Sequence, residues 1–430
     1  DRLFDLLILD EAHEMNHAGS AQSKAAHRLS GLPGVPTLVL SGSLMGGYAS
    51  SLFANFWALS PAFRLEFERS DAAAFVGRYG YRRLLLETGS ASSGKAARDG
   101  RRGSRTDREL GRTTILGEAP GVLPEFLMRH LLQTAVVVHK ADLDVELPPL
   151  TETPVALAAE DALDLDLLAE YRRLQGELLA RIRADRFVPG RSGKLLGALV
   201  ELPSYLDRAT DDLPPFDVVD PDDGPIATGR AFPSSWRTPK ERWLADAVRE
   251  RLRAGEKVIV FVRHTGTSAL PQRLLSILRE TTSDVAWLDA KKVAPAKREA
   301  WIDQHVLGRG VRVLLVNPNA VRTGLNNLVS FTTAVWYELE TSATTFRQAN
   351  GRLHRIGQTR PVTVLTPYYA GTAQQVTFEL VAKKISASLQ VDGLDLQAAL
   401  EAAGAGEDQA GALAAAMSLG RAVYEALARS

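Results

Sequence analysis

The sequence contains no cysteine among its 430 residues. Disulfides, thiolate metal sites and cysteine nucleophiles are therefore excluded. Neither sign of charge is in excess, because 51 Lys and Arg residues balance 51 Asp and Glu residues. Overall charge therefore predicts no polyanion partner, and any affinity for nucleic acid has to come from local basic patches. No apolar run approaches the roughly 18 residues that a transmembrane helix needs, so no membrane contact is expected.

The chain starts without an initiator Met and without a recognisable signal peptide, so we expect a cytoplasmic protein. Residues 4–9 are typical of a buried parallel strand. Such a strand needs neighbours to pair with, and we expect them to lie upstream. The chain is therefore predicted to be the C-terminal piece of a longer protein.

Length and composition predict a globular protein of two or three domains, since 45% of the residues are hydrophobic and the chain exceeds the size of a single core. Short apolar strands alternate with helical segments, which indicates an α/β fold with parallel sheets. The second sheet is expected to contain strands at residues 257–262, 285–288, 311–316, 333–337 and 362–365. The predicted parts are an α/β segment (1–60), a helical and loop insertion with an Arg-rich mobile loop at 90–112 (61–150), a helical insertion ending in a Pro-rich linker (151–235), a second α/β domain (236–393) and an Ala-rich helical tail (394–430).

The acidic segment Asp10-Glu11-Ala12-His13 follows the first strand directly. Ligand-binding groups of open α/β sheets lie at the carboxyl ends of strands, so two adjacent carboxylates there suit a Mg²⁺–nucleotide site. Asp10 is predicted to hold Mg²⁺ through water, because this ion keeps part of its hydration shell. Glu11 is predicted to polarise the water that attacks the γ-phosphate. The alternative is a loop with surface acids.

Two further segments carry candidate residues. Ser41-Gly42-Ser43 follows the second strand, where hydroxyl groups can bond a neighbouring catalytic loop; the alternative is a plain strand-to-helix turn. Arg352 and Arg355 are spaced three apart within residues 348–358, and on a helix they would share a face. Two guanidinium groups can clamp phosphate oxygens in phosphoryl transfer, whereas the alternative is an exposed basic helix.

Taken together, these segments resemble the motifs of superfamily 2 helicase-type ATPases, and within them the Swi/Snf-like group of the phage and mobile-element type. The family's order holds over roughly residues 1–390: residues 10–13 resemble motif II, 41–43 motif III, 258–265 motif IV, 317–318 with 323–326 motif V, and 348–358 motif VI. The resemblance implies two RecA-like lobes, the first incomplete here. It also implies that ATP binds between the lobes and that its hydrolysis drives movement along DNA, with duplex DNA favoured.

The resemblance further implies roles for individual residues. Glu11, Arg352 and Arg355 would be catalytic, and ATP with Mg²⁺ would be held by Asp10, Thr323, Gly324 and Gln348. Hydrolysis would be coupled to strand contact by His13, Ser41 and Ser43. Nucleic acid would be contacted by Arg263, His264, Asn317 and Asn326. The Arg-rich loop adds Arg101 and Arg102 as candidate phosphate contacts, with a solvated loop as the alternative.

Two departures from the family pattern bear on activity. The phosphate-binding loop G-x-x-x-x-G-K-[ST], which precedes motif II in the family, occurs nowhere in the sequence. Without its Lys the β- and γ-phosphates lose their main cradle. We therefore expect this chain alone neither to bind ATP well nor to hydrolyse it. In addition, Asn326 stands where many members of the family carry Asp.

Three functions are considered on the sequence alone. The leading one is an ATP-dependent DNA translocase or helicase, of which this chain is the C-terminal part. Its competitor is a non-enzymatic module that binds nucleic acid or a protein partner and has lost the phosphate-binding loop. A nucleotide-dependent nuclease subunit is disfavoured, because no cluster of acids and lysine typical of a nuclease site is recognised.

Overall fold

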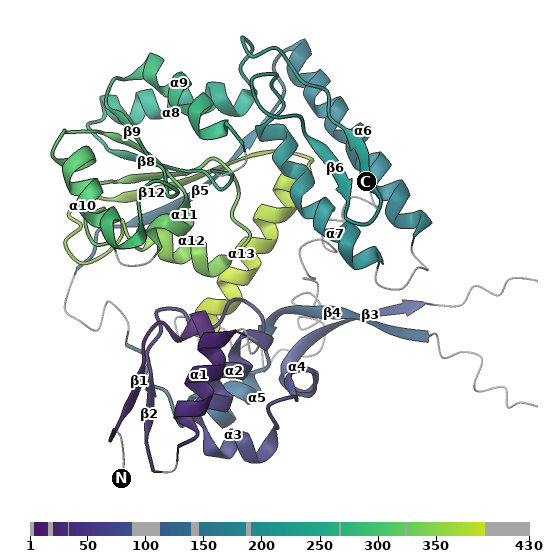
Figure 1. The fold of residues 1–430 in the computed structure, drawn as a ribbon, viewed down its shortest axis with the longest axis vertical. Coiled ribbons are helices and arrows are strands. Elements are labelled where there is room, and N and C mark those ends of the chain that lie inside the picture. The colour runs from purple at the N-terminus through teal and green to yellow at the C-terminus, as the bar shows by residue number, and fades with distance from the viewer. Residues whose placement is uncertain are drawn as a thin grey trace, which may run out of the picture. The chain divides into compact units, whose positions relative to one another are not determined.

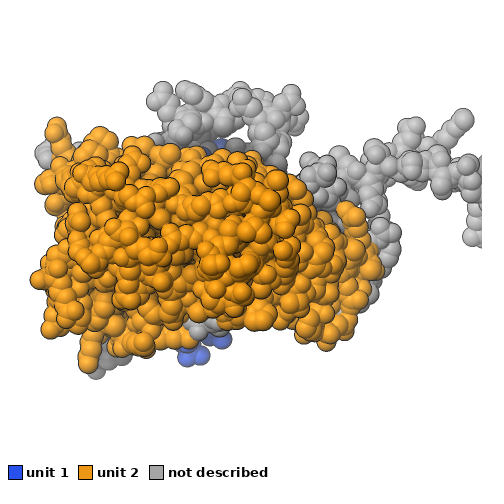
Figure 2. Space-filling model, turned by 90° about the horizontal axis from the view of Figure 1, so that it is seen from above, with its two compact units in different colours: residues 1–137, 386–418 blue, residues 138–385, 419–430 orange. Residues whose placement is uncertain are grey.

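The computed structural model describes residues 4–15, 20–32, 34–87, 112–138, 146–185, 191–265, 268–322 and 325–391 (Figure 1). The described residues divide into two compact units, which Figure 2 shows in different colours. Unit 1 comprises those up to residue 137 and those from 386 onward, and unit 2 comprises those within 138–385. The predicted α/β class is confirmed. None of the described helices is both long and apolar enough to cross a bilayer.

Unit 2 is built on a six-stranded sheet in which every neighbouring pair of strands is parallel. In sheet order the strands are β5 (Leu150–Leu157), β12 (Val362–Tyr369), β11 (Thr333–Trp336), β8 (Val258–Phe261), β10 (Val313–Val316) and β9 (Val285–Leu288). All five predicted strands are present. In β8, Ile259 and Phe261 enter one core cluster, while Val258 and Val260 enter the other. Both faces of β8 are buried, which is why this strand reads as an uninterrupted apolar run.

Helices cover both faces of this sheet. Helices α8 (Pro239–Arg253) and α9 (Leu270–Thr281) contribute to the cluster that contains Val258. Helices α10 (Arg298–Ile302), α11 (Pro318–Val321) and α12 (Ala343–Asn350) contribute to the cluster that contains Ile259. The start of α8 is specified locally: Thr238 and Glu241 form a capping box, and proline occupies the first helical position.

The sixth strand, β5, was not predicted. It lies at the edge of the sheet, it contains Pro154, and most of its side chains are exposed. A strand of this kind lacks the apolar run of its buried neighbours, and proline is tolerated at an edge because its missing N–H removes no ladder bond there. The sheet therefore extends outside the predicted range 236–393.

The segment between β5 and α8 forms a helical subdomain within unit 2, which we call the insertion (residues 158–235). Its elements are α6 (Ala162–Ala184), α7 (Arg191–Glu201), the 3-10 helix η5 (Leu202–Asp207) and the antiparallel strands β6 (Asp217–Asp220) and β7 (Gly224–Thr228). Leu174, Tyr205 and Phe232 are fully buried in its core cluster. Residues 211–235 were predicted to be a linker, but they contain the β6–β7 hairpin and pack against α6 and η5.

Unit 1 begins with a parallel pair of short strands, β1 (Leu7–Leu9) and β2 (Thr37–Val39), as predicted. Its other elements are η1 (Ala12–Met15), α1 (Ala21–Ser30), α2 (Ser50–Leu59), α3 (Pro61–Glu66), α4 (Ala72–Tyr79), the hairpin β3 (Gly80–Glu87) and β4 (Arg112–Val122), α5 (Pro124–Phe126) and η3 (Leu127–Leu131). The core is a cluster rich in phenylalanine. The last turns of α13 (Ala373–Val391) join it, since Ser388 donates a hydrogen bond to the Met45 carbonyl at 2.8 Å.

The β3–β4 hairpin corrects the prediction for residues 61–150, which foresaw helices and loops but no strands. Arg112, predicted to end a mobile loop, is the first residue of β4. The rest of that loop, including Arg101 and Arg102, lies outside the described residues, as does the predicted tail 394–430.

Candidate functional site

The acidic segment forms a tight turn at the carboxyl end of β1. Asp10 is exposed, and its Oδ1 accepts a hydrogen bond from the Glu11 N–H at 2.8 Å. Glu11 has a φ of 49°, in the left-handed region that residues other than glycine seldom occupy. The Ala12 N–H then bonds the Leu40 carbonyl at 3.0 Å, which ties the turn to the end of β2. A strained backbone held by its surroundings is a feature that clusters at functional sites.

The predicted coupling residues meet this turn. The buried His13 places Nδ1 3.3 Å from Glu11 Oε2 and 3.2 Å from Ser41 Oγ. Ser41 in turn donates to the Ser43 carbonyl at 3.0 Å, which closes the loop after β2. The structure therefore brings together Glu11, His13, Ser41 and Ser43, although 28 residues separate His13 from Ser41. Adjacent parallel strands deliver both loops to the same edge.

The donor set at this turn fits Mg²⁺ held through water. Asp10 offers one exposed carboxylate, and Mg²⁺ in nucleotide sites takes few protein ligands because water and phosphate oxygens complete its shell. Within the described part of the chain, no group of three or more His, Cys, Asp and Glu side chains is placed to hold a metal ion directly.

Arg352 and Arg355 lie in turns beyond the end of α12, which corrects the prediction that they share a helical face. The helix ends at Asn350, with Gly351 as its C-cap. Arg352 Nε donates to the Arg322 carbonyl at 3.1 Å, and Arg355 Nη1 donates to the Leu325 carbonyl at 3.4 Å and to Asn326 Oδ1. Both guanidinium groups thus converge on the loop after α11.

The same loop contains two predicted nucleotide-binding residues, Thr323 and Gly324, which lie outside the described residues. Gln348, a third, is half-buried on α12. Asn326 is exposed, and its N–H donates to Glu299 Oε1 at 3.2 Å. The structure therefore links the motif V and motif VI segments through side-chain bonds to backbone carbonyls.

Gln358, at the end of the motif VI segment, stabilises the backbone around it. Gln358 is buried, and its Nε2 donates to the carbonyls of Val329, Phe331 and Leu353 at 2.7, 3.3 and 3.1 Å. Its Oε1 accepts the N–H groups of the next two residues at 3.0 Å each. The side-chain amide of Gln358 therefore forms hydrogen bonds with backbone groups of three segments, and these groups are not paired within a helix or a strand.

The third group of predicted residues lies at the carboxyl edge of the unit 2 sheet. Arg263 and His264 follow β8, and Asn317 follows its neighbour β10. Asn317 Nδ2 donates to the Arg263 carbonyl at 2.7 Å and to Thr265 Oγ1 at 3.2 Å, so it fixes the turn after β8. Arg263 Nη1 reaches the Leu339 carbonyl at 3.1 Å.

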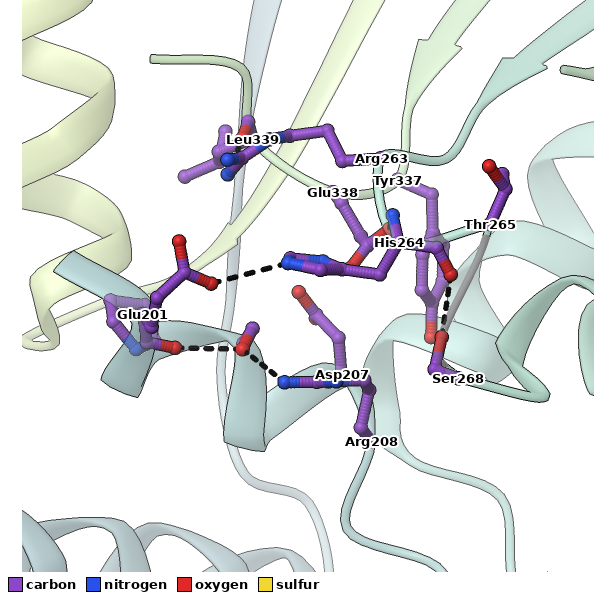
Figure 3. Close-up of polar contacts among 12 residues, drawn as sticks. Glu201, Asp207, Arg208, Arg263, His264, Thr265, Ser268, Tyr337, Glu338 and Leu339 are labelled. Atoms are coloured by element: carbon purple, nitrogen blue, oxygen red, sulfur yellow. Dashed lines mark hydrogen bonds and ion pairs between the residues drawn. The ribbon is translucent and has the colours of Figure 1, made fainter. Parts of the chain in front are cut away.

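His264 lies between two carboxylates (Figure 3). Its Nδ1 is 2.5 Å from Glu338 Oε1, and its Nε2 is 3.2 Å from Glu201 Oε2. Hydrogen bonds to Glu201 and Glu338 raise the pKa of His264 to about 9, against the effect of burial. Both ring nitrogens are therefore donors to protein, and the contact of His264 with nucleic acid stays a prediction.

Sequence reasoning singled out neither carboxylate partner. Glu338 lies two residues beyond the end of β11, so the strand-end rule used for Asp10 applies to it as well. Glu201 is the last residue of α7 and carries no comparable signal. Burial would raise the pKa of Glu338, but its bonds with His264 hold that pKa below the usual range.

A buried ion pair accompanies this group. Lys240 is fully buried, and its Nζ lies 2.7 Å from Asp207 Oδ1, at the end of η5. The ammonium also donates to the Tyr337 carbonyl at 3.1 Å and to Gln374 Oε1 at 2.9 Å. Burial raises the pKa of Asp207, which Lys240 opposes. The insertion and the sheet therefore share a network of charges beneath the carboxyl edge.

Residues 239–357 match the helicase conserved C-terminal domain. The similarity to this family covers this part of the chain. It begins at the first residue of α8 and ends just after Arg355, so it includes the carboxyl-edge residues and both motif VI arginines. Strands β5 and β12 of the same sheet fall outside the matched range.

The similarity of the chain to individual known proteins is distant. The chain is 27% identical over 150 residues to Protein CHROMATIN REMODELING 19 of Arabidopsis thaliana; the match spans 34% of this chain and 18% of the relative's length. Among solved structures, the C-terminal part of the Fun30 ATPase domain is 16% identical with a TM-score of 0.41, covering 58% of this chain and 97% of its own. The Sulfolobus solfataricus SWI2/SNF2 ATPase core in complex with dsDNA is 17% identical with a TM-score of 0.39, covering 91% of this chain and 70% of its own.

Proposed function

We propose that this chain is the C-terminal part of an ATP-dependent DNA translocase or helicase, which couples ATP hydrolysis between two RecA-like lobes to movement on DNA. The observation that carries the proposal is the helicase C-terminal domain at residues 239–357. The acidic turn at Asp10 and the loop of Ser41 precede this domain in the family's order. Duplex DNA is the proposed substrate because the sequence motifs resemble Swi/Snf-like motors, which track duplex DNA.

In this proposal Glu11 accepts a proton from the water that attacks the γ-phosphate. His13, between Glu11 and Ser41, fixes the position of the Glu11 carboxylate and passes changes there to the loop after β2. Asp10 holds Mg²⁺ through water; the bound ion would neutralise charge on the phosphates. The contacts described above supply the orientation that such a base needs.

Arg352 and Arg355 are proposed to act on the nucleotide, with Thr323, Gly324 and Gln348 as its further contacts. In the described conformation these arginines hold the loop after α11. A guanidinium has several donors, so an arginine that bonds a carbonyl can also present N–H groups to phosphate. Arg263 and Asn326 are proposed to contact the DNA backbone.

One observation favours a second candidate, a module that binds nucleic acid or a partner without hydrolysis. The sequence contains no G-x-x-x-x-G-K-[ST], and the nucleotide phosphates need such a cradle. A working motor requires that a segment outside this sequence supplies it.

The two candidates are separated by reading the gene upstream of the codon for Asp1 and assaying the protein it encodes. A strand followed in frame by G-x-x-x-x-G-K-[ST], together with DNA-stimulated ATP hydrolysis that Glu11→Gln abolishes, supports the motor. Glu14→Gln serves as the control, because Glu14 is a neighbouring acid with no proposed role. Hydrolysis that survives Glu11→Gln contradicts the catalytic role of Glu11. A complete protein that lacks the loop and does not hydrolyse ATP contradicts the motor and favours the binding module. The present chain alone should show no ATPase activity.

A further inference from the structure

The contacts of His264 tie the insertion to the sheet within unit 2. Glu201 ends α7 in the insertion, and Glu338 follows β11 in the sheet. Glu338 is bound twice by the same residue, because the His264 N–H donates to Oε2 at 2.8 Å while Nδ1 donates to Oε1. His264 thereby holds the end of β11, and through Nε2 it holds the end of α7 (Figure 3).

The charges around His264 explain why its ring is kept as a cation. Glu338 is 2% exposed, and a buried carboxylate needs a partner of opposite charge. Glu201 adds a second negative charge from the insertion, while Arg208 opposes it from the end of η5. Arg263 lies on the same turn and acts on Glu338. Lys240 is neutralised by Asp207, so it does not replace His264 as the partner of Glu338.

The turn that His264 belongs to carries the proposed DNA contact. Arg263 and Thr265 flank His264, and the Arg263 carbonyl and the Thr265 hydroxyl are both bonded by Asn317. Asn317 fixes this turn from β10, and Glu338 fixes it from β11. From outside the sheet, Glu201 fixes it from the insertion, and Ser268, just before α9, donates a hydrogen bond to the His264 carbonyl at 2.6 Å. A change in the position of α7 would therefore move the turn that contains Arg263.

We propose that Glu201 is a positioning residue for nucleic-acid binding: by pairing with His264, it lets the insertion set the orientation of the turn Arg263–Thr265 that contacts the DNA backbone. This inference rests on the proposed function. It gives the insertion a role, as a support for the carboxyl edge of the helicase C-terminal domain.

The test compares Glu201→Gln with Glu177→Gln in the present chain. Glu177 is a matched control, since it lies in the same insertion, is partly exposed, and pairs with Arg173 on its own helix. Two quantities are measured for each variant: the pKa of the His264 imidazole by NMR titration, and the affinity for a short DNA duplex at several salt concentrations. Thermal unfolding confirms that both variants remain folded.

We expect Glu201→Gln to lower the pKa of His264 and to weaken duplex binding about threefold, the loss expected for a partly exposed ion pair. The slope of affinity against salt should stay unchanged, because Glu201 contacts no phosphate, whereas Arg263→Ala should reduce that slope by about one. Glu177→Gln should change neither quantity. Loss of a negative charge would by itself strengthen binding to a polyanion, so weaker binding points to position rather than charge.

Each other outcome contradicts the inference in its own way. An unchanged pKa of His264 shows that the pair does not exist in solution. A lowered pKa with equal or tighter DNA binding shows that the pair exists but does not orient the turn. If the wild-type chain binds no duplex at low salt, the proposed DNA contact of Arg263 fails and the positioning role fails with it. The His264 titration distinguishes that case, since it reports on the pair without DNA.

Discussion

The paired His264 should make the stability of unit 2 fall as the pH rises. The folded pKa of about 9 exceeds the usual value of 6.5, so the stabilisation is fully present below pH 6.5 and is lost as the pH rises through about 9. Each pKa unit corresponds to roughly 1.4 kcal/mol, which gives roughly 2 to 3 kcal/mol at pH 7 and almost none at pH 10. The His264 side chain is 19% exposed, so solvent screening reduces this little.

The assay is urea unfolding of the wild type and of His264→Gln at pH 7 and pH 10. Five of the six tryptophans lie in the range of unit 2, namely Trp236, Trp243, Trp287, Trp301 and Trp336, so tryptophan fluorescence mainly follows its unfolding. Other groups that titrate in this interval affect both proteins alike. The gap in unfolding free energy between wild type and variant should therefore shrink by roughly 2 to 3 kcal/mol between the two pH values. A gap that is the same at both would refute the reasoning.

Two further substitutions test the polar groups that hold unit 2 together. Asp207→Asn should destabilise unit 2 by about 3–5 kcal/mol in urea unfolding, because it leaves the buried Lys240 ammonium without an anion. Adding Lys240→Met should recover much of the lost stability. A loss that persists in the double variant would contradict this account. Gln358→Ala should lower the free energy of unfolding by about 2–4 kcal/mol, because it removes the hydrogen-bond partners of several buried backbone groups. If the variant melts at the same temperature as the wild type, water has replaced the lost partners and this account is wrong.

How far the sequence predicts the fold depends on how each strand is buried. Strand β8 could be recognised because Ile259 and Val260 are buried on opposite faces, so no polar residue interrupts its run. The edge strand β5 has no such run. The β3–β4 hairpin was missed because its connection is Gly- and Arg-rich, a composition that indicates a loop and says little about the strands on either side.

The candidate site was predictable where its residues follow the ends of strands. The turn at Glu11 and the loop at Ser41 follow adjacent strands, and the structure brings them into contact. The helical reading of residues 348–358 failed because Gly351 ends α12, and spacing alone does not reveal that. The pairing of His264 with Glu201 joins residues 63 positions apart, and neither side chain has a local pattern that identifies the other.

The pairing of β5 with a strand far along the chain has a consequence for folding during synthesis. β5 pairs with β12, which follows about 200 residues later, so the strand leaves the ribosome long before its partner exists. An unpaired strand is a template for pairing with other chains, and polar side chains and proline reduce that hazard. The exposed residues of β5 and Pro154 therefore reduce pairing with other chains until β12 has been synthesised. A more apolar β5 would therefore be more prone to pair with other chains during synthesis.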